Sequence, residues 1–246
     1  MEISRTQLVA IDAKPEPVTI DPERAALIVI DMQNDFGSPG GMFDRAGVDI
    51  SGIRQAIEPT KRAIAAARKQ GIPIVYVKMG FRPDLSDAGP PGSPNRIKHV
   101  RIHAGKTVQA PDGTESRILI RDTWNTDIVR ELAPEADDIV MYKHRFSAFY
   151  DTELDDILKR LNAQSLIFTG CTTSVCVEST IRDAMFRNYS CILLEDCTAE
   201  PIGQGLPRSN HEASLLVLQT LFAWISHSEK FIEALEQRAA VVAGSV

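Results

Sequence analysis

Long apolar runs, cysteine and excess positive charge are all scarce in this sequence. Its longest apolar runs, such as AALIVI at residues 25–30, are too short to cross a bilayer, and the first residues lack the apolar core of a secretion signal. We therefore expect no membrane segment. With only four cysteines in 246 residues, a disulfide scaffold is disfavoured and a reducing cytoplasm is the expected setting. The formal net charge of −6 gives no support to nucleic-acid binding, which needs a basic face.

Apolar runs and helical patterns alternate along the chain and predict a parallel sheet covered on both faces by helices. The composition, 43% apolar and 24% charged, is ordinary for a globular protein that buries a core. The runs predict strands at residues 25–32, 72–79, 138–143, 165–170 and 191–196. The periodicity predicts helices at residues 53–71, 152–162 (with Thr152 as N-cap), 211–226 (with a short strand around 222–225) and 228–240.

Two segments depart from this alternation. Residues 1–22 precede the first strand as an N-terminal extension. Residues 81–122 are rich in glycine, proline and charge, and they predict a long irregular loop. Because such a loop inside a compact domain is usually functional or disordered, we interpret this one as a lid-like insertion.

The stretch LIFTGCTTSVCVESTIRDA, at residues 166–184, carries two cysteines where a strand gives way to a helix. Ligands of open parallel sheets bind at this end of the strands. If the helix begins near Val175, Cys176 lies in its first turn, where free N–H groups and the helix dipole favour a thiolate, the nucleophilic form of the thiol. The N–H groups of the turn can also stabilise an oxyanion. A buried thiol without a chemical role is the simpler alternative, and it suits Cys171 better.

Two charged residues end predicted strands, Asp31 the first and Lys143 the third. Either one alone fits a solvated strand boundary equally well. Together with Cys176 they form a set of a base, a cation and a nucleophile, in which the ammonium lowers the pKa of both the thiol and the carboxylate. Histidine is the more usual partner of a catalytic thiol, but the five here stand in no evident relation to Cys176: His99, His103, His144, His211 and His227.

Three segments resemble the signature blocks of the isochorismatase-like cysteine hydrolases: ALIVIDMQNDF, YKHRFSAFYDTELDDIL and FTGCTTSVCVESTIRDA. The resemblance runs in matching order from about Ala25 to Trp224. It implies one α/β/α domain over residues 1–246, with a six-stranded parallel sheet in the order 3-2-1-4-5-6. It also implies a homo-oligomer, a dimer or a tetramer.

The resemblance assigns roles as well. It implies a catalytic triad of Asp31, Lys143 and Cys176, and a cis peptide bond between Cys171 and Thr172. The backbone amides of Thr172 and Cys176 would form the oxyanion hole. The implied reaction is hydrolysis of a C–N bond through a covalent thioester-type intermediate, with no cofactor.

Within this family the sequence departs from two branches. The isochorismate-cleaving members lack the nucleophilic cysteine, so Cys176 argues against vinyl-ether hydrolysis. The nicotinamidase branch holds a metal with an aspartate and two histidines near the end of the second strand, whereas the segment KMGFRPDLSD contains no histidine. No metal is expected, and the pair His99 and His103 fits a solvated basic segment better than a metal site.

A third branch fits better. SPGGMFDRAGVDIS, AGPPGSPN and RFSAFYDTELDDIL resemble the ureidoacrylate amidohydrolases, and less closely the biuret hydrolases. A small ureido or carbamoyl compound is therefore the expected substrate, and a neutral amide such as biuret is the alternative. A thiol redox protein is disfavoured because C-x₄-C is not the C-x-x-C spacing of that class. An inactive ligand-binding scaffold is a further alternative.

Several residues are weaker candidates for substrate contacts. Arg96 or Arg101, in the basic segment at residues 94–106, could clamp a substrate carboxylate, or the segment could simply be solvated. For the others a structural role is the alternative: pocket walls or core packing for Phe36 and Phe149, a polar contact or the shaping of a turn for Asn34, and a substrate contact or a surface position for Gln219.

Overall fold

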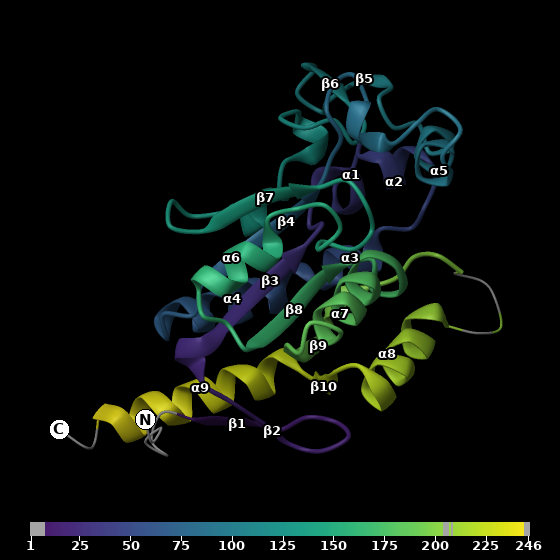
Figure 1. The fold of residues 1–246 in the computed structure, drawn as a ribbon. Coiled ribbons are helices and arrows are strands. Elements are labelled where there is room, and N and C mark those ends of the chain that lie inside the picture. Colours follow the sequence, from purple (N-terminus) through teal and green to yellow (C-terminus); the bar gives the residue numbers. More distant parts are fainter. Residues whose placement is uncertain (1–7, 204–206, 208, 244–246) are drawn as a thin grey trace.

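Six parallel strands form the central sheet of the protein (Figure 1). The computed structural model describes residues 8–203, 207 and 209–243. The sheet order is β10-β9-β8-β3-β4-β7, which is 3-2-1-4-5-6 when these strands are counted along the chain, so the predicted topology is confirmed. The strands are β3 (Ala25–Ile30), β4 (Ile74–Met79), β7 (Ile139–Lys143), β8 (Ser165–Cys171), β9 (Ser190–Ala199) and β10 (Trp224–Ser226).

Helices cover both faces of the sheet, because alternate residues of each strand point to opposite sides. On β3, Leu27 and Val29 pack in one core cluster with α4 and α9, while Ala26 and Ile28 pack in a second cluster with α6, α7 and α8. Within the described residues no helix has the length and apolar character needed to cross a membrane. The helices are α1 (Asn34–Gly37), α2 (Met42–Arg45), α3 (Ser51–Gln55), α4 (Ile57–Lys69), α6 (Leu154–Arg160), α7 (Glu178–Met185), α8 (Asn210–Leu221) and α9 (Ser228–Ala243).

Most element boundaries differ from the prediction by a few residues. The helix expected at residues 53–71 is divided into α3 and α4, and β9 extends beyond Asp196 to Ala199. Helix α6 begins at Leu154 rather than after Thr152, although the Thr152 hydroxyl still accepts the N–H of Leu154 at 3.3 Å. Helix ends shift in this way because the local sequence fixes caps less firmly than packing does.

The N-terminal extension contains an antiparallel hairpin, β1 (Val9–Ile11) and β2 (Val18–Ile20). The turn of this hairpin contacts the edge strand β10: the N–H of Lys14 donates to the carbonyl of Ile225 at 2.8 Å, and the reverse bond is 2.9 Å. An uncovered edge strand invites pairing with another chain, so the hairpin protects this side of the sheet.

The insertion at residues 81–122 is not the irregular loop that its composition predicts. It contains helix α5 (Pro94–Arg101) and a two-stranded ribbon of β5 (Thr107–Gln109) and β6 (Glu115–Arg117). The start of α5 carries an ordinary helix signal, since Ser93 caps the N–H of Arg96 and proline follows at the first helical position. The ribbon escaped prediction because its strands are short and largely exposed, without apolar alternation.

Asp35 fastens the insertion to the sheet. Its carboxylate is fully buried and accepts the backbone N–H groups of Leu119, at 2.7 Å, and of Met42, at 3.0 Å. The side-chain amide of Asn125 donates to the same carboxylate. Burial raises the pKa of Asp35 to about 6, against the opposing effect of these donors. One side chain thus joins α2, the insertion and the turn after it to the segment that follows β3.

Asp35→Asn should destabilise the fold by about 2–4 kcal/mol, because one acceptor oxygen becomes an NH₂ group that faces buried donors. Urea unfolding measures the change. Asp44→Asn is the matched control: Asp44 accepts the N–H of Gly40 at 2.8 Å on an exposed surface and should lose less than about 1 kcal/mol. Equal losses in the two variants would contradict the anchoring role of Asp35.

Candidate active site

Asp31, Lys143 and Cys176 meet at the carboxyl ends of the strands. Nζ of Lys143 lies 2.8 Å from Oδ2 of Asp31, and the thiol of Cys176 lies close enough to the same carboxylate to influence its pKa. The exposed fractions of the three residues are 1%, 0% and 7%, in the order Asp31, Lys143 and Cys176. These groups form a buried cluster of a carboxylate, an ammonium and a thiol.

The strand order explains how the cluster assembles. β8 adjoins β3, so the turn that carries Cys176 begins beside Asp31. β7 is separated from β3 by β4, so Lys143 must reach across the end of β4. It does so over Met79, whose sulfur lies 3.6 Å from Nζ, and it also donates to the carbonyl of Arg145 at 3.2 Å.

Burial sets the protonation of this cluster. It raises the pKa of Asp31, while Lys143 and the thiol act in the opposite direction. Burial alone would lower the pKa of Lys143, but the neighbouring carboxylate reverses this and the pKa lies above its usual value. Burial and the charge of Asp31 both raise the pKa of Cys176. These directions favour a resting thiol beside a carboxylate–ammonium pair over the thiolate that the helix position alone favoured.

The backbone around Asp31 is unusually constrained. Asp31 itself has a φ of 53°, in the left-handed region that few residues other than glycine adopt. Gly170 has a φ of 114°, and a Cβ there would lie 1.9 Å from the carbonyl oxygen of Ile30. Cys171 donates its S–H to the carbonyl of Asp31 at 3.2 Å. Only glycine lets β8 approach β3 this closely, and Cys171 serves as part of the frame.

Gln33, which the sequence analysis missed, links the ends of β3 and β4. Its side-chain amide donates to the carbonyl of Met79 at 2.9 Å and accepts the N–H of Met79 at 2.6 Å. The side chain is fully buried. Because this buried glutamine pairs with both backbone groups of Met79, it fixes the distance between two strand ends. One is the end of β3, which Asp31 follows, and the other is the end of β4, which the Lys143 side chain crosses. A polar residue directly after a buried strand was the available signal.

The nucleophile turn differs from the expected helix start. The peptide bond between Cys171 and Thr172 is cis. A π-helical turn follows at Thr173–Val177, and α7 begins only at Glu178, so Cys176 lies in the π turn rather than in the first turn of an α-helix. Single π turns occur often at functional sites. The carbonyl of Thr172 accepts the N–H groups of Val175 and Val177, at 3.1 and 3.2 Å.

Polar side chains from the end of β9, from the residue after it and from α8 hold this turn in place. Oε2 of Glu200 accepts the N–H of Ser174 at 2.9 Å, and the Ser174 hydroxyl donates to the same oxygen. The hydroxyl of Thr173 lies 2.9 Å from that of Thr198 and 2.9 Å from Nδ1 of His211. The position of Cys176 is thus fixed by side chains that lie outside the cluster itself.

Three of the weaker candidates serve the fold. The Asn34 amide donates to the carbonyl of Trp124 at 2.7 Å and accepts the Ser38 hydroxyl at 2.7 Å, so it shapes the turn after β3. The aromatic candidates pack on other rings, Phe36 edge-on against Phe43 and Phe149 stacked on Tyr189. These contacts give each residue a structural role, and a substrate contact by any of the three stays a prediction.

Two candidates lie away from the cluster. Arg101 is exposed and lines a separate cavity of about 490 Å³ with Met42 and Phe43. Gln219 lines a groove with Asn188 and Tyr189, which precede β9 and so mark the opposite, amino end of that strand. Neither residue lines a cavity with a member of the cluster, and a substrate contact by either one stays a prediction. Helix periodicity could not orient α8, because apolar residues occupy nearly all of its faces.

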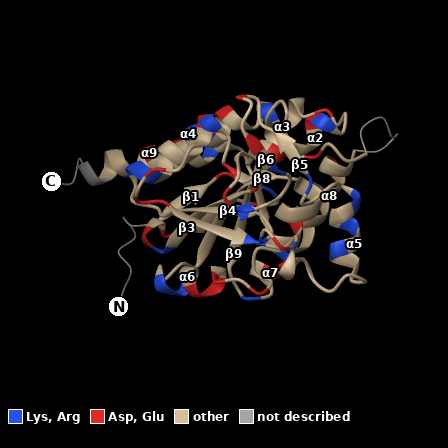
Figure 2. Cartoon of the chain, turned by 90° about the horizontal axis from the view of Figure 1, so that it is seen from above, with Lys and Arg blue, Asp and Glu red and all other residues tan. Residues whose placement is uncertain are grey.

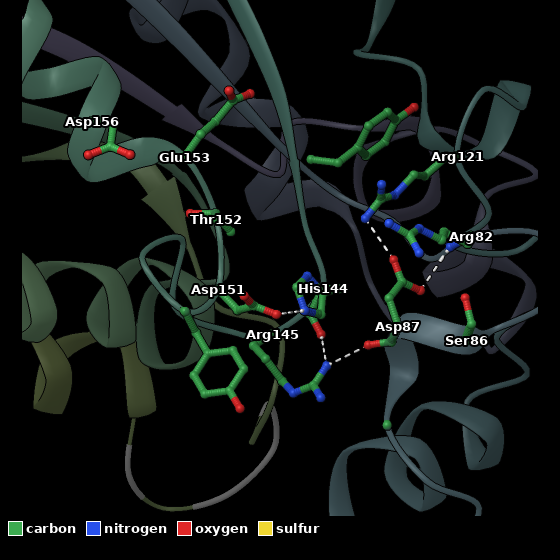
Figure 3. A pocket seen from close by; sticks show the side chains of 13 residues that line it. Arg82, Ser86, Asp87, Arg121, His144, Arg145, Asp151, Thr152, Glu153 and Asp156 are labelled. Carbon is green, nitrogen blue, oxygen red and sulfur yellow. Dashed lines mark hydrogen bonds and ion pairs between the residues drawn. The ribbon is translucent and has the colours of Figure 1, made fainter.

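Arg96 stays a candidate. It lies on α5, where Figure 2 shows basic residues gathered. Its guanidinium donates to the carbonyl of Gly89 at 3.3 Å, and Gly89 lines a cavity of about 730 Å³ at the end of β7 (Figure 3). Arg145 lines the same cavity and donates to the carbonyl of Asp87 at 2.9 Å. None of the three cluster residues lines this cavity, and Arg145 is the link between the two, because its carbonyl accepts from Lys143.

His99 is not solvated as expected. Its side chain is only 3% exposed, whereas His103 is exposed. In the described part of the chain no group of three or more histidine, cysteine, aspartate or glutamate side chains has the arrangement of a metal site. The basic residues around His99 in the sequence concealed its burial, because the partners that bury it come from other segments.

Comparison with known proteins agrees with this architecture. Residues 25–230 match the Isochorismatase domain, and the chain belongs to the isochorismatase family. A ureidoacrylate amidohydrolase RutB from Methylobacterium radiotolerans is 42% identical over 237 residues, which cover 96% of this chain and 89% of the relative. The RutB of Cronobacter sakazakii is 41% identical over 231 residues, covering 94% and 97%.

Solved structures show the same fold. A cysteine hydrolase from Pseudomonas syringae has a TM-score of 0.74 at 27% identity, covering 89% of this chain and 95% of its own. N-carbamoylsarcosine amidase from Thermoplasma acidophilum has a TM-score of 0.60 at 25% identity, covering 83% and 96%.

The raised pKa of Cys176 predicts slow alkylation by iodoacetamide at neutral pH. Below the pKa of a thiol, its thiolate fraction rises about tenfold per pH unit, so the rate should climb steadily from pH 6 to 9. Asp31→Asn removes a negative charge that raises this pKa, so it should speed alkylation at pH 7 while it slows turnover. A rate that is already flat near pH 7 would show a preformed thiolate and contradict the expectation.

Proposed function

We propose that this chain is a cysteine amidohydrolase that cleaves the C–N bond of a small ureido or carbamoyl compound. The observation that carries the proposal is the ion pair of the buried carboxylate of Asp31 with the Lys143 ammonium, in one buried cluster with the Cys176 thiol. A nucleophile, its base and a fixed cation thus lie in one water-poor site. The RutB relatives, named for ureidoacrylate, and the N-carbamoylsarcosine amidase likeness support the substrate class.

In the first half of the reaction, Asp31 accepts the thiol proton of Cys176 while the sulfur attacks the carbonyl carbon. The electron pair of the C=O bond moves to oxygen, where the backbone amides of Thr172 and Cys176 stabilise the charge. The tetrahedral intermediate then collapses. The C–N bond breaks, and the departing nitrogen takes the proton from Asp31, which leaves an S-carbamoyl enzyme.

In the second half, water attacks the carbamoyl carbon and gives its proton to Asp31. The C–S bond breaks, the sulfur recovers that proton, and carbamic acid leaves and loses its own proton to solvent as carbamate. Lys143 stays protonated throughout, because its pKa is raised. Its charge stabilises the carboxylate at rest and the thiolate as it forms. The negative charge therefore moves from Asp31 to Cys176 beside a cation that does not change.

Cys176→Ala should abolish ammonia or amine release from ureido substrates, because no covalent intermediate can form. Asp31→Asn should lower kcat by a factor of about 10² or more, because the proton acceptor is lost. Intact-protein mass spectrometry of the wild type under turnover should show the S-carbamoyl adduct. The control is Cys191→Ala, which removes a buried thiol outside the site.

If Cys176→Ala kept its turnover, the proposed nucleophile would be wrong. If the wild type formed no adduct and turned over neither ureido acids nor biuret, the alternative of a ligand-binding scaffold would replace this proposal.

We further propose that the substrate is acidic and that Arg96 contacts its carboxylate. Arg96→Met should raise KM for a ureido acid about tenfold, a loss of about 1.4 kcal/mol, and leave a neutral amide such as biuret nearly unchanged. Arg101→Met is the matched control on the same helix, since that side chain faces another cavity. An equal loss for both substrates would point to helix packing, and no loss would favour a neutral amide.

Two features support the proposals that the enzyme works in the cytoplasm and that it forms a homo-oligomer. All four cysteines are free thiols, as expected in the reducing cytoplasm. Helix α8 exposes large apolar side chains, with Leu216 and Leu221 each 63% exposed. Such a surface supports a homo-oligomer, because contiguous exposed apolar area is a frequent mark of an interface.

A further inference from the structure

His99 presents a hydrogen-bond acceptor that the proposed mechanism does not use. Its Nδ1 lies 2.8 Å from the carbonyl oxygen of Asn95. Because a carbonyl oxygen can only accept, Nδ1 carries the proton, and Nε2 of the neutral ring has a free lone pair. Among the residues that the structure describes, none makes a hydrogen bond to Nε2.

The ring of His99 lies over the strand ends from which Lys143 enters the site. Phe81, which follows β4, meets it edge-on at 5.0 Å between ring centroids, and Phe146, which follows β7, lies at 5.3 Å. The two segments are tied together where they leave the sheet, since the N–H of Gly80 donates to the carbonyl of Lys143 at 3.0 Å. The imidazole therefore contacts two aromatic rings, and it lies near enough to Lys143 and Arg145 for their charges to act on it.

The surroundings keep this ring neutral. Burial lowers the pKa of His99, the bond to the Asn95 carbonyl acts in the opposite direction, and the positive charges of Lys143 and Arg145 lower it further. At neutral pH the ring is an acceptor at Nε2. The other groups near it cannot take that role: the Lys143 ammonium only donates, and the two phenyl rings are apolar.

We propose that His99 accepts a hydrogen bond from the substrate nitrogen that stays on the carbonyl carbon, and that it thereby selects ureido compounds over simple amides. This inference rests on the proposed function. The departing nitrogen must lie beside Asp31 to receive its proton, and an unprotonated Nε2 has no proton to give. The nitrogen left for His99 is the second one of the ureido group. A simple amide has a carbon there, and it would leave Nε2 unpaired.

The test compares two substrates with the same leaving amine, an N-carbamoyl compound and its N-acetyl counterpart. His99→Phe keeps an aromatic ring between Phe81 and Phe146 but removes the acceptor. It should lower kcat/KM for the carbamoyl substrate about tenfold or more, mainly through KM, and leave the acetyl substrate unchanged. His99→Gln places an amide oxygen near the position of Nε2 and should keep most of the preference.

Two further variants make the test independent of folding defects. His99→Asn keeps a donor for the Asn95 carbonyl but no acceptor at the Nε2 position, so it should lose the preference as His99→Phe does. His103→Asn changes the exposed histidine nearby and should alter neither rate. An equal loss for both substrates in His99→Phe and His99→Asn would show a structural role only, and unchanged rates would show no contact. Either result overturns the inference.

The outcomes that would contradict the proposed function differ from those that would contradict the inference about His99. If the wild type hydrolyses neither substrate and forms no adduct at Cys176, the amidohydrolase proposal is wrong. If it hydrolyses the carbamoyl substrate and every His99 variant keeps the full preference, only the inference about His99 is wrong.

Discussion

The buried ion pair of Lys143 and Asp31 constrains the rest of the structure. Two charges at 2.8 Å with no more than 1% exposure are stable only because each neutralises the other, and removing one partner typically costs about 3–5 kcal/mol. The pair also requires a particular sheet, because its members come from strands that β4 separates. The contacts of Gln33 with Met79 and the closeness that Gly170 permits follow from this requirement.

In the proposed mechanism, the same pair determines when the thiol becomes reactive. Cys176 shares the carboxylate with Lys143, and the negative charge of Asp31 opposes a second anion beside it. Ionising the thiol therefore requires its proton to move onto Asp31, after which the ammonium faces a thiolate instead of a carboxylate. The net charge of the cluster does not change in this step. Such an exchange needs little rearrangement of the surroundings, which suits a site held by buried backbone contacts.

The sheet order and the cluster could be predicted from the sequence because both depend on strong local signals and on a family resemblance. β3 and β8 are continuous apolar runs, and Asp31 and Lys143 interrupt or end such runs with a charge. The burial of His99 could not be predicted, because Phe81 and Phe146 come from distant segments and its own neighbours along the chain are basic. The π turn at Cys176 was missed for a similar reason, since the contacts of Glu200 and Thr198 hold it.

The insertion and the sheet contribute different groups to the proposed site, and Asp35 joins the two. The sheet supplies the reacting groups, whereas α5 carries His99 and Arg96, the two side chains assigned here to substrate selection. The N–H of Phe81 donates to the carbonyl of Leu119 at 2.8 Å, which closes the insertion at its base. Asp35 binds the N–H of the same Leu119, and it lies just after Asp31 in the chain. Substitutions on α5 can therefore change which substrate fits without moving the carboxylate, the ammonium or the thiol.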